Sequence, residues 1–275
     1  MFSVKEITSA DLSSLYSSEL YHILLFEGEG ILTVDFTEYK FHDKIVYFAS
    51  PYQHFKITTN NPFKISIIAF HGDFYCIEYH KKEVACNGLL FNNIFLDPFI
   101  ILDNNDFEEL FQLIQKLKTE LNNNSPFSEP ILKAYLQLIL AIASKVKNQK
   151  IKDPITSIPP DNKIEQFKSL LEEHFLDQRQ PSFYADTLAL TPNVFTKKCK
   201  EYLRKTPSQV IQERVILEAK KLIHLTRMSF KEIATSLNFK DEHYFSRYFK
   251  KNTGVTPSLF REKVGVSIVA DLSMN

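Results

Sequence analysis

Short apolar runs of β-branched and aromatic residues, separated by polar turn residues, recur over the first quarter of the chain. This pattern predicts β-strands. The segment 27–30 holds two glycines and predicts a turn between the first two runs. No helical period interrupts this region, so it favours a small antiparallel barrel or sandwich. The expected strands cover residues 21–26, 30–36, 44–48, 55–58 and 64–70.

The period changes to that of a helix after Asp103. Apolar residues recur at helical spacing over 107–121, and again over 131–142 with a broader apolar face. The polar segment 122–126 ends with a proline and separates the two helices. A short break of this kind predicts an antiparallel pair, which we expect to cover the barrel and also to meet a second subunit.

A linker and a second, all-helical region are expected after this pair. Residues 148–161 show no hydrophobic period and include three prolines, which is typical of an interdomain linker. The pattern thus predicts an α+β protein. Its expected parts are a β-barrel (1–105), a helix pair for dimerisation (106–147), the linker (148–161), a domain of two helix-turn-helix units joined by a helix (162–265), and a tail (266–275).

The two helix-turn-helix units are visible as an internal repeat. Residues 184–200 are matched by residues 233–250, with an offset of 49 at Leu188 and Leu237 and of 50 at Phe195 and Phe245. The second copy therefore has one extra residue in its central turn. Two such units joined by a helix over residues 207–225 are typical of DNA-binding proteins.

Capping residues support these helix assignments. Thr-Pro pairs at 191–192, 206–207 and 256–257 each supply an N-cap followed by proline at the first helical position. Capping boxes are expected at Thr206 and Ser229. Asp241 is expected to cap the second reading helix and Gly254 to end it, whereas Arg204 at the matching place in the first copy suggests a different end.

In each unit one helix must expose polar residues to DNA while its apolar face packs. Val194, Phe195 and Cys199 are expected to pack in the first copy; the packed positions of the second are expected among Tyr244, Phe245, Tyr248 and Phe249. Arg247 is the strongest candidate for reading a base, because a guanidinium can bond O6 and N7 of guanine together. The predicted DNA contacts are Asn193, Thr196, Lys197, Lys200, Glu242, His243, Ser246, Arg247 and Lys250.

Charge and composition agree with this interpretation. The net charge is zero, but residues 1–150 carry −5 and residues 151–275 carry +5, and the window 195–251 alone carries +8. Such an excess would serve phosphate contact. No signal segment or membrane-length apolar run is seen, and three cysteines show no paired spacing, so we expect a cytoplasmic protein.

Residues 163–263 resemble the DNA-binding domain of the AraC/XylS family of bacterial transcription regulators, most specifically over 234–257 with its Tyr-Phe-Ser-Arg-Tyr-Phe-Lys-Lys run. Asn238 replaces the glycine common at that place. The resemblance implies a regulator, either an activator or a repressor, that binds double-stranded DNA as a homodimer under the control of a small-molecule effector, with RNA polymerase as a further partner. It names neither effector nor operator, and no effector-binding residues can be assigned.

The N-terminal strands are similar to the cupin-like sensing barrel of such regulators, since residues 43–54 match a cupin motif that ends in His54. His22 stands alone before Glu27, so a set of three metal ligands is missing and neither metal nor cofactor is expected. The alternative, a cupin-type enzyme with a helical appendage, needs such a site. DNA alkylation repair would need an activated cysteine, and none has the required context. We therefore expect no enzyme.

Overall fold

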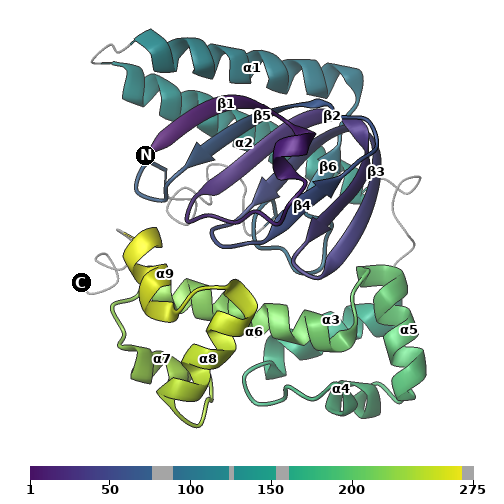
Figure 1. Cartoon of the computed structure of the whole chain (residues 1–275). Coiled ribbons are helices and arrows are strands. Elements are labelled where there is room, and N and C mark those ends of the chain that lie inside the picture. The colour runs from purple at the N-terminus through teal and green to yellow at the C-terminus, as the bar shows by residue number, and fades with distance from the viewer. Residues whose placement is uncertain (76–88, 124–126, 153–160, 268–275) are drawn as a thin grey trace. The chain divides into compact units, whose positions relative to one another are not determined.

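The computed structural model describes residues 1–75, 89–123, 127–152 and 161–267. Contacts divide the chain into two units: Met1–Asn93 with Asp97–Lys152 and Glu262–Asn275, and Ile94–Leu96 with Asp153–Arg261. The first unit contains an antiparallel sheet and two helices, and the second is helical (Figure 1). The expected α+β class, with an N-terminal sheet before an all-α domain, is confirmed.

The sheet is antiparallel throughout its described strands, with the order β1-β5-β2-β3-β6 and with β4 added beside β2. The long strand β2 pairs with β5 through its first half and with β4 through its second half, so the sheet curls on itself. β1 and β6 end the order, which leaves the barrel incompletely closed. The strands are β1 Phe2–Thr8, β2 Tyr21–Val34, β3 Thr37–Ala49, β4 Phe55–Thr58, β5 Lys64–Phe70 and β6 Phe99–Ile101.

The predicted turn at residues 27–30 is wrong, because β2 continues through it and pairs with β3 along its whole length. The glycines serve close approach instead of a turn. A Cβ on Gly28 would lie 2.5 Å from the ring of Phe63, and one on Gly30, where φ is +158°, would lie 2.5 Å from the Thr58 carbonyl oxygen. The strand β1 and the short β6 were not anticipated from the pattern.

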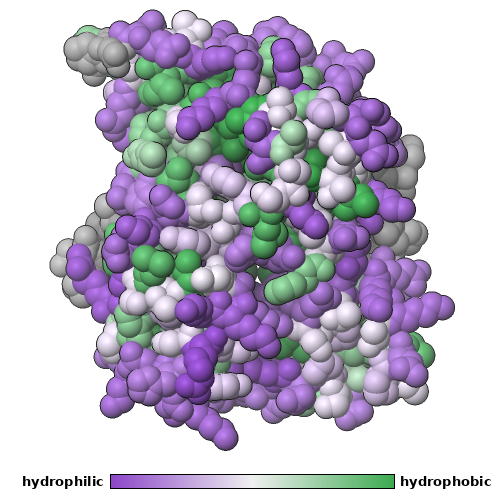
Figure 2. Space-filling model, in the orientation of Figure 1, coloured by the Kyte–Doolittle hydropathy of each residue, from purple (hydrophilic) through white to green (hydrophobic). Residues whose placement is uncertain are grey.

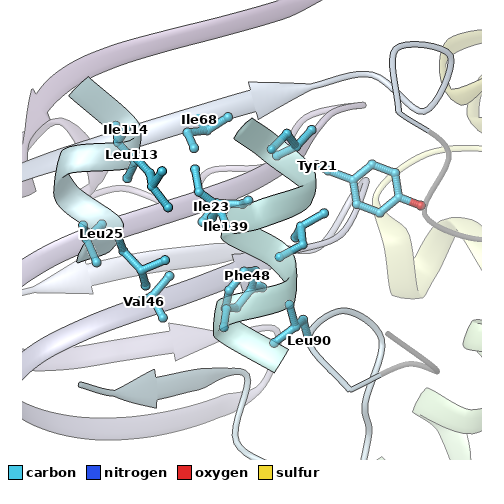
Figure 3. Packing of buried hydrophobic residues seen from close by; sticks show 14 of the residues in the cluster. Tyr21, Ile23, Leu25, Val46, Phe48, Ile68, Leu90, Leu113, Ile114 and Ile139 are labelled. Carbon is cyan, nitrogen blue, oxygen red and sulfur yellow. The ribbon is translucent and has the colours of Figure 1, made fainter. Parts of the chain in front are cut away.

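Two apolar clusters occupy the two faces of this sheet. One lies inside the curl and consists of strand residues such as Leu24, Phe26, Tyr47 and Phe55. The other joins the outer face to the helix pair α1 (Asn104–Asn123) and α2 (Ser128–Lys152). Figure 3 shows side chains of this second cluster pointing toward one another from both layers: Ile23, Leu25, Val46, Phe48, Ile68, Leu113, Ile114 and Ile139.

The helix α2 is longer than the pattern predicted. It continues to Lys152, so residues 148–152 belong to the helix and not to the expected linker. The first helix breaker is Pro154, which disfavours the helical conformation at the residue before it. The remainder of the expected linker up to Pro160, and most of the tail, fall outside the described residues.

The helical unit follows the predicted order. It contains α3 (Asn162–His174), α4 (Pro181–Thr187), α5 (Pro192–Leu203), α6 (Pro207–Leu225), α7 (Phe230–Ser236) and α8 (Glu242–Thr253). The ninth helix of the described residues, α9, spans Pro257–Val264. The helix predicted to join the two repeats is confirmed as α6.

Candidate nucleic-acid interface

The two helix-turn-helix units are α4–α5 and α7–α8, and each has the same packed interior. Phe195 and Cys199 of α5 are buried, as are Phe245 and Phe249 of α8, at positions 50 residues apart. Phe195 packs against Phe167 of α3 with ring centroids 4.9 Å apart. Burial raises the pKa of the Cys199 thiol to about 12, so this cysteine remains a protonated core residue.

The capping chemistry expected from the sequence is present at each helix start. Thr191 and Asp241 accept hydrogen bonds from the backbone N–H groups of Val194 and Tyr244, over 3.4 Å and 2.7 Å. Reciprocal capping boxes join Thr206 to Gln209 and Ser229 to Glu232. These bonds use backbone donors that a helix leaves unpaired at its N-terminus.

Both reading helices end in the same way. Gly254 ends α8 with a left-handed φ of 78°, and Arg204 ends α5 with a φ of 57°. The expectation that Arg204 would give a different end is therefore wrong: the left-handed cap is adopted by a residue with a Cβ. A non-glycine residue pays a conformational cost there, which the surrounding packing must offset.

The turns within the two units are also equivalent. Ala189 and Asn238 both adopt left-handed φ values, 52° and 53°. The next residue in each unit donates its N–H to a helix carbonyl, Leu190 to Ala185 and Phe239 to Ala234. The extra residue of the second copy is thus Lys240, which follows the part of the turn that both copies share and precedes the cap Asp241.

The predicted DNA contacts lie on one face of each reading helix. Asn193, Lys197 and Lys200 are exposed on α5, and Thr196 is half-buried between them. The matching residues of α8 show the same exposure, with the neighbouring Glu242 half-buried. This second set consists of exposed His243, Arg247 and Lys250 and half-buried Ser246.

The predicted contacts have the same residue spacing on both helices, and several of them are positively charged. Each set occupies positions i, i+3, i+4 and i+7, which face one side of a helix. Within the described residues, Lys197, Lys200, Arg247 and Lys250 form no ion pair with an acid. The adjacent Lys198 differs, because its ammonium bonds to the Asp161 carboxylate. Hydrophilic residues predominate over the lower part of Figure 2, where Figure 1 labels α4, α5, α7 and α8.

Two exposed residues on these faces were missed. Val194 is 43% exposed and Tyr244 is 47% exposed. The prediction that Val194 packs is wrong, because almost half of its side chain is exposed in the first turn of α5. Both residues stand directly before a buried phenylalanine at an offset of 50, so comparing the two copies at the helix start could have found them.

The candidate metal ligands of the N-terminal unit are occupied by other contacts. His22 is buried, with Nε2 3.3 Å from the Tyr16 hydroxyl and 3.4 Å from that of Ser18. Glu27 pairs with Lys44, and the ring Nδ1 of His54 lies 3.8 Å from the Asp35 carboxylate. Among the described residues no group of three His, Cys, Asp or Glu side chains is placed to hold a metal ion.

In the described parts of the chain, no helix has the length and apolar character to cross a membrane.

Comparisons with protein families and known sequences also find a helix-turn-helix domain in the helical unit. Residues 184–263 match a family model described as a helix-turn-helix domain. The chain is 30% identical to the arabinose operon regulatory protein of Escherichia coli K12 over 104 residues, 38% of this chain and 36% of that protein. It is 22% identical to the HTH-type transcriptional activator RhaR of the same strain over 245 residues, 87% of this chain and 83% of RhaR. A crystal structure of ToxT from Vibrio cholerae O395 covers 96% of this chain with a TM-score of 0.41 at 16% identity.

Proposed function

Because the chain belongs to the AraC/XylS family of DNA-binding transcription regulators, we propose that one polypeptide reads two successive major grooves through α5 and α8. The observation that supports this is the equivalence of the two exposed faces. Asn193, Thr196, Lys197 and Lys200 occupy on α5 the positions that residues 50 further on occupy on α8. Matching polar faces without internal ion pairs at Lys197 and Arg247 suit contact with two similar stretches of DNA.

The residues of each face have distinct roles in this proposal. Those in the first two turns reach base edges, and Arg247 bonds a guanine. Lys200 and Lys250, one turn further along, meet phosphates. Val194 and Tyr244 add apolar contact of the kind that thymine methyl groups accept. Glu242 suits the exocyclic amine of cytosine.

The length of α6 suits this arrangement. Its 19 residues span about 28 Å, and successive major grooves on one side of the duplex lie about 34 Å apart. A rigid helix of that length can place two reading helices one DNA turn apart.

The proposal is tested by selecting bound duplexes from a random pool and measuring affinity for the selected sequence by fluorescence anisotropy. Arg247→Ala should cost about 1–3 kcal/mol and relax the preference at one base pair. The matched control is Lys145→Ala, which removes an exposed positive charge from α2 and should leave affinity within twofold. If Arg247→Ala and Lys197→Ala bind every duplex as well as the parent, the assigned reading face is wrong.

We also propose that a small-molecule effector binds inside the curled sheet. The supporting observation is Tyr47, whose side chain is fully buried and whose hydroxyl has no hydrogen-bond partner among the described residues. An unpaired buried hydroxyl costs about 1–3 kcal/mol, and a polar group of a ligand would recover it. The ring of His22, which like that of Tyr47 packs against Phe55, is neutral at pH 7, because burial lowers its pKa to about 4.

The effector proposal is tested by measuring the melting temperature of the protein in the presence of small-molecule fractions of host-cell extract. A binding fraction should raise the melting temperature of the wild type and have a smaller effect on Tyr47→Phe, which keeps the ring and removes the hydroxyl. Equal shifts in both proteins would place the ligand elsewhere.

For dimerisation we propose the exposed face of α2, where Ile131 is 37% and Leu138 is 46% exposed. These residues lie seven positions apart and so share one side of the helix. Sedimentation should show a dimer for the wild type and a monomer for Leu138→Glu. A dimer in both proteins would place the interface on another surface.

We propose a cytoplasmic regulator without catalytic activity. The alternative, a cupin-type enzyme, would require metal in the N-terminal unit, and metal analysis of the purified protein decides between the two. A stoichiometric transition metal would favour the enzyme.

A further inference from the structure

The segment between α3 and α4 contacts the turn of the second helix-turn-helix unit. Arg179 donates from Nη2 to the Leu237 carbonyl oxygen. Asn238 donates from its side-chain amide to the Asp177 carboxylate over 3.1 Å. The Arg179 guanidinium also lies 4.1 Å from the ring centroid of Phe239. Three consecutive turn residues, Leu237 to Phe239, are thus held by a segment about sixty positions earlier in the chain.

This turn is the part of the second unit that sets the direction of α8. Leu237 follows α7, so its carbonyl belongs to the group that a helix leaves unpaired at its C-terminus. Asn238 has the left-handed φ that reverses the chain. Phe239 packs against Tyr244 and Tyr248 of α8, with ring centroids 5.8 Å and 5.2 Å apart. Phe239 thus contacts both the Arg179 guanidinium and two rings of the reading helix.

Arg179 is suited to this position. Burial lowers the pKa of its guanidinium, while the neighbouring Tyr248, Tyr244 and Asp177 oppose that shift. Arginine stays charged in such surroundings, and its planar group can stack on a ring while donating a hydrogen bond in the plane. A lysine would supply the charge without the stacking geometry.

The first unit shows why this contact couples the two units. Leu188, the equivalent of Leu237, accepts a hydrogen bond over 2.8 Å from Lys163 of α3. The same carbonyl in each repeat thus receives a cation. In the first unit the cation comes from the adjoining helix α3, and in the second it comes from the segment that leads into α4. Of these two contacts, only the second joins the segment leading into the first reading unit to the turn of the other unit.

We infer that Asp177, Arg179 and Asn238 form a brace that fixes the orientation of α8 relative to α5, and so sets the spacing of the two DNA half-sites that one chain accepts. This rests on the proposed reading of two grooves. The three are positioning residues, since they act through Phe239 and the turn and not through contact with DNA. The brace is a connection between the two units in addition to α6, which packs against helices of both.

The test uses duplexes selected by the wild-type protein from a random pool, remade with one or two base pairs inserted or deleted between the two half-sites. The wild type should lose at least tenfold in affinity on each change. Arg179→Ala should bind the parent duplex about threefold to tenfold more weakly and lose clearly less on the changed duplexes. On duplexes that retain only one half-site it should match the wild type.

Asn238→Gly is the matched second variant, because glycine keeps the left-handed turn and removes only the bond to Asp177. It should relax the spacing preference in the same direction, and adding Asp177→Ala to it should have only a smaller further effect, through the Arg179 guanidinium beside Asp177. Arg179→Lys should restore less than half of the loss. Urea unfolding of each variant verifies the folded state before binding is measured.

The inference is overturned if Arg179→Ala and Asn238→Gly keep the wild-type spacing preference. It is also overturned if Arg179→Ala weakens binding to the single half-site of α8 as much as to the full duplex, since the residue would then act within one unit. A wild-type protein that selects no duplex, or tolerates every spacing, contradicts the proposed function itself and is distinguishable from both outcomes.

Discussion

The guanidinium of Arg214 lies 3.8 Å from the ring centroid of Phe175, between α6 and the end of α3. The same group donates to Glu172 over 2.9 Å and to Glu218 over 3.0 Å. One side chain thereby joins the helix between the two units to the first helix of the domain. Its stem and head are largely buried, with 13% of the side chain exposed.

Replacing Arg214 should destabilise the helical unit. We expect Arg214→Ala to lower the free energy of unfolding by about 1–3 kcal/mol, because a stacked cation and its packing are lost together. Arg214→Lys should recover only part, since lysine lacks the planar fork. Urea denaturation measures both. Exposed Lys221 of α6 is the control, and equal stability of Lys221→Ala and Arg214→Ala would contradict the stacking.

Stability should fall with acid through His22. Burial lowers the pKa of His22 from 6.5 to about 4, against the opposing Leu20 backbone and Glu19 charge. Between these values the unfolded chain binds a proton that the native protein does not, so stability is full above pH 6.5 and declines toward pH 4. The loss should be on the order of 3 kcal/mol.

The measurement for His22 is the difference in unfolding free energy between the wild type and His22→Gln from pH 4 to pH 7. Taking the difference cancels the contribution to the unfolding free energy of carboxylates that titrate in both proteins. The wild type should lose stability faster over this range, and parallel curves would show that His22 is not held neutral.

The left-handed turn at Ala189 offers a stabilising change. Its φ of 52° is costly for a residue with a Cβ, and its side chain is exposed. Ala189→Gly should raise stability by about 0.5–1 kcal/mol after the greater freedom of the unfolded glycine is subtracted. The melting temperature measures this. Ala185, buried inside α4, is the contrast, and its replacement by glycine should destabilise.

Phosphate contact predicts a specific salt dependence. Lys250→Ala should weaken binding to all duplexes alike and lower the slope of log K against log salt by about one. Arg247→Ala should change the preferred sequence as well. The slopes are measured by anisotropy titrations between roughly 50 and 200 mM salt, the range over which phosphate contacts lose much of their affinity. An unchanged slope in Lys250→Ala would remove that residue from the interface.

Local chemistry made much of the helical unit predictable. The caps at Thr191, Thr206, Ser229 and Asp241 and the helix 207–225 are found where the sequence indicated them, because N-caps and proline at the first position act within one turn. The buried residues Phe195, Cys199, Phe245 and Phe249 were among the positions expected to pack, together with Val194 and Tyr244, which are exposed. The DNA contacts remain predictions whose positions on exposed faces are compatible with the proposal.

Other features could not be read from neighbours in the chain. Residues 27–30 look like a turn locally, yet pairing with β3 keeps them in a strand, where the missing side chains admit Phe63 and the Thr58 carbonyl. Val194 has a core-like side chain, yet it is exposed in the first turn of α5. The polar residues Tyr47 and His22 are buried by strands distant in sequence.

By itself, the sequence determined where several helices of the second unit begin, that the unit is a repeat, and which polar residues share a face, since caps and helical spacing act within a few positions. Only the tertiary structure decided that Asp177 and Arg179 meet the turn at Leu237–Phe239. A bond between residues sixty positions apart leaves no periodicity or capping pattern in the chain, because its partners are brought together by the packing of the helices between them.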